Sequence, residues 1–77
     1  MKINVLTFGV ITDITGSSAL IINNADSTDC LKEMMEEKYP GLKIIRYAIA
    51  VNKQLVQQNT SLDNNATVAL LPPFSGG

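Results

Sequence analysis

The chain has 77 residues and a mass of 8.3 kDa, which leaves room for a single small domain. Six basic and seven acidic residues give a formal net charge of −1, and without a basic excess we expect no nucleic-acid binding. No apolar run approaches the roughly 20 residues of a membrane helix. Histidine is absent and Cys30 is the single cysteine, which argues against a metal site and against an enzyme that acts alone.

The opening of the chain predicts two strands joined by a loop. Residues 2–8 alternate with the period of two that is typical of a strand. One face of this strand carries Ile3, Val5 and Thr7, and the other carries Lys2, Asn4, Leu6 and Phe8. Residues 9–18 contain two glycines and short polar residues, which favour a loop. Residues 19–22 are apolar and rich in β-branched side chains, which predicts the second strand.

A helix is predicted over about residues 28–39. Capping oxygens precede it at positions 26–28, and apolar side chains recur at helical spacing. These side chains are Leu31, Met34, Met35 and Tyr39. Pro40-Gly41 is predicted to end the helix. Cys30, in the first turn, is expected to be a small core residue.

The second half of the chain predicts two or three more strands. Residues 47–51 form an apolar run, and Asn52-Lys53 is a turn signal before a short strand at Leu55 and Val56. Residues 57–65 are polar and turn-prone, with Leu62 as an expected anchor. Residues 67–71 predict the last strand. Its faces carry Val68 and Leu70 on one side, and Thr67, Ala69 and Leu71 on the other.

The order of these elements predicts an α+β roll. A mixed sheet of four to five strands is expected to be covered on one face by one main helix. The first and last strands must then be neighbours to close one core around that helix. This arrangement is the β-grasp, or ubiquitin-like, architecture. We expect the domain to span residues 1–72 and a flexible C-terminal diglycine tail to span residues 73–77.

The most informative segment closes the sequence, at residues 72–77. Pro72-Pro73 is stiff and lacks N–H donors, whereas Gly76-Gly77 is slim and conformationally free. Such a tail can thread a narrow channel and present its α-carboxylate there. A carboxylate becomes an acyl donor only after activation, for which the chain offers neither a nucleotide-binding loop nor a histidine base. Taken alone, the glycines are equally compatible with a frayed end.

These features resemble the small, sulfur-carrier subunit of molybdopterin synthase. The resemblance spans essentially the whole chain and includes residues 50–52 and 62–65, and the Pro-Pro-x-Ser-Gly-Gly ending is its most specific part. It implies that an ATP-dependent activating enzyme adenylates Gly77, and that sulfur then gives a thiocarboxylate. Phe74, Ser75, Gly76 and Gly77 would enter the large synthase subunit, where the sulfur passes to a pterin precursor of the molybdenum cofactor.

The resemblance also assigns the catalytic residues to the large subunit, in an expected heterotetramer. This chain would hold no metal and no cofactor, and only AMP or sulfur would be attached transiently to Gly77. Its expected location is cytoplasmic, because no signal-peptide segment opens the sequence and one cysteine permits no internal disulfide.

A partner-binding patch is implied at the positions that match Phe8, Leu55 and Leu71, next to Pro72 and Pro73. The alternation supports it, since Phe8 and Leu71 are apolar residues on otherwise polar strand faces. Two departures concern partner choice. Phe74 stands where the family often has a small aliphatic residue, and residues 66–67 stand where it often has acidic ones.

Three alternatives stay open. A thiamine-pathway sulfur carrier shares the fold and the diglycine, although its ending usually lacks the proline pair. A ubiquitin-like protein modifier shares the chemistry up to the adenylate, after which Gly77 would be joined to a lysine of a target. An interaction module with an inert tail predicts that deletion of Gly76-Gly77 has no consequence.

Overall fold

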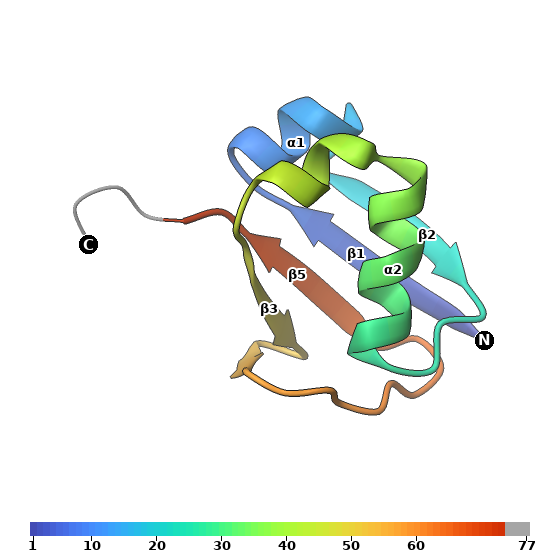
Figure 1. The fold of residues 1–77 in the computed structure, drawn as a ribbon. Coiled ribbons are helices and arrows are strands. Elements are labelled where there is room, and N and C mark those ends of the chain that lie inside the picture. The colour runs from blue at the N-terminus through green and yellow to red at the C-terminus, as the bar shows by residue number, and fades with distance from the viewer. Residues whose placement is uncertain (74–77) are drawn as a thin grey trace.

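The structure, a computed structural model, describes residues 1–73, which fold as one mixed sheet with helices on one side (Figure 1). The elements in chain order are β1 (Lys2–Thr7), α1 (Val10–Thr15), β2 (Ala19–Asn23), α2 (Thr28–Lys38), the 3-10 helix η1 (Pro40–Ile44), β3 (Ala48–Val51), β4 (Gln54–Val56) and β5 (Thr67–Leu71).

The sheet has the strand order β2-β1-β5-β3-β4. The central pair, β1 and β5, is parallel, and the other three pairs are antiparallel. The first and last strands are therefore neighbours, as predicted, and α2 lies across one face of the sheet (Figure 1). This is the expected α+β roll of the β-grasp class, with a mixed five-stranded sheet and one main helix.

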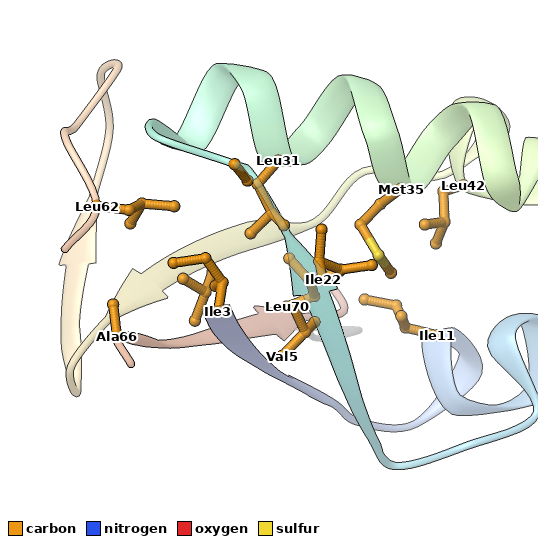
Figure 2. Packing of buried hydrophobic residues seen from close by; sticks show 12 residues of the cluster. Ile3, Val5, Ile11, Ile22, Leu31, Met35, Leu42, Leu62, Ala66 and Leu70 are labelled. Carbon is orange, nitrogen blue, oxygen red and sulfur yellow. The ribbon is translucent and has the colours of Figure 1, made fainter. Parts of the chain in front are cut away.

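The core lies between α2 and the sheet, and Figure 2 shows its packing. The inward side chains of β1 and β5 that the alternation assigned to one face are all fully or almost fully buried. They are Ile3, Val5, Thr7, Val68 and Leu70. Leu31 and Met35 of α2 close the core from above, and Leu62 anchors the long loop as predicted. Cys30 is half-buried and packs against this cluster.

The ends of the predicted elements follow local chemistry. Ser27 caps α2 by accepting a hydrogen bond from the Cys30 N–H at 3.2 Å. Asn52 and Lys53 both take positive φ, as a two-residue hairpin turn of type I′ requires. Pro40 does end α2, but it also opens η1, because proline is well suited to the first position of a helix.

The prediction of a continuous loop over residues 9–18 is wrong, because α1 forms there. Its residues are mostly β-branched and are flanked by Gly9 and Gly16, so local propensity disfavours a helix. Burial outweighs that propensity, since Ile11 is fully buried in the core. None of the helices within residues 1–73 is long and apolar enough to cross a membrane.

Candidate functional site

The sheet face opposite α2 is apolar in its middle and has no helix over it among the described residues (Figure 1). The strand register aligns one small or apolar side chain from each of four strands into a row across this face. The row runs Leu6, Ala69, Ala50, Leu55. Phe8 and Leu71 stand next to it, each two residues further along the chain, Phe8 just beyond the end of β1 and Leu71 at the end of β5. We call these six residues the apolar face.

Two large side chains of the apolar face are exposed to solvent. Phe8 retains 46% and Leu55 62% of its accessible surface. All six side chains line an open depression of about 510 Å³, together with Asn52, Lys53 and Thr67. Contiguous exposed apolar surface is one of the features of protein–protein interaction sites.

A second depression of about 320 Å³ adjoins the first, because Leu55 and Leu71 line both. Its remaining lining residues are Arg46, Tyr47, Ala48, Pro72 and Pro73. The apolar surface therefore continues from the middle of the sheet to Pro72-Pro73, which we call the tail base. Because β1 and β5 are parallel, both end at this edge, and Phe8 lies at the same end of the sheet as the tail base.

The charged residues that line the two depressions are Lys53 and Arg46, both cationic. A docking partner with acidic side chains around an apolar centre would complement this arrangement.

On the covered side of the sheet, the Tyr47 hydroxyl donates a 2.6 Å hydrogen bond to Glu36 of α2. Burial, this bond and the charge of Glu36 raise the pKa of Tyr47 well above its usual value. Tyr47 therefore stays protonated, and its hydrogen bond links α2 to the start of β3.

The structure brings together the five described residues that the sequence singled out for partner binding. Leu55, Leu71, Pro72 and Pro73 surround one depression, and Phe8 lines the other. Phe74, Ser75, Gly76 and Gly77 lie outside the described residues, so the predictions for them stay predictions. No group of three metal-ligating side chains occurs within residues 1–73.

Sequence reasoning missed half of the apolar face, namely Leu6, Ala50 and Ala69. Alternation along β1 and β5 already placed Leu6 and Ala69 on the outer faces of their strands. Alternation along residues 47–51 likewise separates Ala50 from Ile49 and Val51, but its position beside Ala69 depends on the register between β3 and β5.

Comparison with known proteins shows the family of the chain. Residues 5–77 match the model of the ThiS family. The chain belongs to the ThiS family. The predicted membership in the β-grasp sulfur carriers is thereby confirmed, and the chain is a small protein of the class that comprises sulfur carriers and ubiquitin-like modifiers.

Three solved structures are similar over almost their full length. A chain of the complex of subunits 1 and 2 of the molybdopterin-converting factor from Helicobacter pylori is 30% identical, with a TM-score of 0.76 and all of both chains covered. A putative molybdopterin converting factor subunit 1 from Pyrococcus furiosus shares the fold at a TM-score of 0.88 and 20% identity, covering 96% of this chain and 99% of that one. The modifier protein SAMP1 from Haloferax volcanii shares it at 0.83 and 16% identity, covering all of both chains.

Proposed function

We propose that this chain is the small, sulfur-carrying subunit of a molybdopterin synthase. The observation that carries the proposal is the apolar face, which continues without a break to the tail base. A subunit that must insert its C-terminal residues into a partner needs a docking surface beside the point where those residues leave the fold. The full-length similarity to a chain of the two-subunit Helicobacter pylori complex supports the same assignment.

The proposed chemistry takes place on the carboxylate of Gly77. An oxygen of that carboxylate attacks the α-phosphorus of ATP on the activating enzyme, and pyrophosphate leaves. A sulfur nucleophile then attacks the acyl carbon and expels AMP, which yields the thiocarboxylate. In the large subunit the thiocarboxylate sulfur attacks a carbon of the pterin precursor and displaces oxygen from it, which forms a thioester between Gly77 and the pterin. Hydrolysis of this thioester leaves the sulfur on the pterin and restores the Gly77 carboxylate. Before that attack, a closed channel keeps water from the activated acyl group.

In this scheme the chain supplies no catalytic residue and binds no cofactor of its own. Its folded part docks on the large subunit through Phe8, Leu55 and Leu71, while Pro72 and Pro73 carry the tail into the channel. We expect acidic residues of the large subunit to face the cations Lys53 and Arg46. We place the cycle in the cytoplasm, where ATP is available and the free thiol of Cys30 is stable.

A ubiquitin-like modifier is the second candidate, and the fold similarity to SAMP1 from Haloferax volcanii favours it over an inert module. Both functions use the adenylate of Gly77 and differ in the acceptor, which is sulfur in one and a target lysine in the other. A thiamine-pathway carrier would use the same thiocarboxylate and differ only in the enzyme that receives the sulfur.

An intact mass of the chain, purified from its own cells with its natural C-terminus, tests the proposal. Replacement of one oxygen by sulfur adds about 16 Da, and fragmentation must place that increment on Gly77 and not on a methionine. A control variant with one residue added after Gly77 is expected to stay unmodified. Conjugates to lysine would favour the modifier. A carboxylate that stays unmodified with ATP, sulfide and the candidate activating enzyme would overturn the carrier assignment.

A further inference from the structure

Gly9 and Pro72 meet where β1 ends and the tail base begins. A Cβ atom built on Gly9 would lie 3.1 Å from Cγ and 3.9 Å from Cβ of Pro72. The first distance is shorter than the 3.5–4.0 Å or so of an ordinary carbon–carbon contact, so the proline ring packs directly on the glycine backbone. Gly9 also has φ 55° and ψ −131°, a conformation that residues with a side chain rarely adopt. The backbone conformation therefore favours glycine here, and a methyl group at this position would require the Pro72 ring to move by a few tenths of an ångström.

The first turn of α1 holds Gly9 in place. The Gly9 carbonyl accepts hydrogen bonds from the N–H groups of Thr12 at 3.0 Å and Asp13 at 3.4 Å. The helix is in turn bonded to β1 through the buried hydroxyl of Thr7, which lies 2.9 Å from the Thr12 hydroxyl and donates to the Ser17 carbonyl at 2.6 Å. Gly9 therefore cannot move away from Pro72 without disturbing bonds that fix α1 to the sheet.

The far side of α1 is supported as well. Ile11 is fully buried in the core, and a Cβ on Gly41 of η1 would come within 3.2 Å of the Ile14 side chain. Helix α1 is thus packed between η1 and the end of β1. A close-packed support of this kind transmits a displacement instead of absorbing it.

We propose that Gly9 is a positioning residue, whose bare backbone seats the Pro72 ring and thereby sets the direction in which the tail leaves the sheet. The φ angle of each proline is nearly fixed, so the orientation of Pro72 is passed on through Pro73. The inference rests on the proposed function, because direction matters only if the tail must reach a reaction centre. There, a displacement of about 1 Å can lower a rate by up to about 100-fold.

The test compares two glycine substitutions that both place alanine at a positive φ, with ψ −131° at Gly9 and ψ 6° at Gly16. Because backbone strain is larger at Gly9, the Pro72 variant below separates strain from the contact. Gly9→Ala adds a methyl group against Pro72, whereas Gly16→Ala at φ 79° has no atom within 4 Å of its new methyl group. We expect Gly9→Ala to lower the thiocarboxylate fraction in cells on the order of tenfold, and Gly16→Ala by less than about twofold. Urea unfolding of each variant separates this effect from loss of fold.

A second substitution tests the same contact from the other side. Pro72→Ala removes Cγ but leaves β5 intact, so it lowers loading by itself while removing the atom that Gly9→Ala would strike. If Gly9 acts through the proline ring, Gly9→Ala costs less loading in the Pro72→Ala background than in the wild-type background. An equal loss from Gly9→Ala in both backgrounds would overturn the proposal.

NMR spectra of the protein alone give a readout that needs no activating enzyme. Gly9→Ala is expected to shift the amide signals of residues 74–77 more than Gly16→Ala shifts them. Unchanged tail signals, or normal loading of Gly9→Ala, would exclude a positioning role for Gly9. An absence of thiocarboxylate from the wild-type chain would instead count against the proposed function, so the two failures are distinguishable.

Discussion

Both faces of the central strands carry large apolar side chains, but one face is buried and the other is open. On the α2 side, the alternate residues of β1 and β5 are at most 1% exposed, apart from Thr7 at 2%. On the other side, apolar residues at the intervening positions line an open depression. The faces thus differ in what covers them and not in hydrophobicity alone. An apolar surface that a fold builds but does not cover is available to a partner.

The neighbours Leu70 and Leu71 give the largest expected contrast between the faces. Leu70 is 1% exposed under α2, whereas Leu71 lines both outer depressions. Leu70→Ala is expected to lower the free energy of unfolding by about 2–5 kcal/mol through cavity formation. Leu71→Ala is expected to lower it by less than about 1 kcal/mol. Urea denaturation of both variants measures the difference, and equal losses would show that the outer face also contributes to the core.

A substitution on the outer face should affect binding and not stability, and Phe8→Asp tests this expectation. A charge on the docking surface, beside the tail base, is expected to weaken binding to the large synthase subunit by about 2 kcal/mol or more. Ile21→Asp is the matched control, since Ile21 is 55% exposed and points from β2 to the same side of the sheet. Calorimetric titration with the large subunit measures both variants. Unchanged affinity of Phe8→Asp would refute the docking assignment.

The third prediction concerns Thr7, which is the one polar side chain on the covered face of β1. Thr7→Val keeps the shape but leaves the Thr12 hydroxyl and the Ser17 carbonyl without this partner. We expect the free energy of unfolding to fall by about 1–2 kcal/mol. Thr67→Val, at a half-buried position on the outer face, should change it by less than about 0.5 kcal/mol. Similar values for the two variants would argue against a structural bond network around α1.

Tyr47 gives the smallest effect, which appears only at high pH. Its pKa is raised above the ordinary value of 10.0 in the folded chain, so folding favours the protonated phenol. The unfolded chain releases this proton first, and the contribution to stability is present below about pH 10 and is lost as the pH rises further. Urea midpoints at about pH 8 and about pH 10.5 should differ more in the wild type than in Tyr47→Phe. An identical pH dependence would exclude this role for the Glu36 bond.

Local sequence patterns predicted most of the strands and the main helix correctly. The alternation of residues 2–8 and 67–71 correctly predicted the faces of β1 and β5, and the helical spacing of Leu31 and Met35 predicted α2 and its buried stripe. The same reasoning failed for α1, where β-branched residues between glycines favour a loop. That helix exists because Ile11 is buried against elements remote in the sequence.

The sequence by itself determined which side chains share a strand face or a helix stripe, because periods of 2 and 3.6 are properties of the local backbone. Only the tertiary structure decided how the two faces are covered, since α2 packs on one side of the five-stranded sheet and no helix within residues 1–73 packs on the other. It also brought Ala50 and Leu55 into line with Ala69, and Gly9 against Pro72. These contacts join distant strands, and strand register and close packing set them where local periodicity cannot.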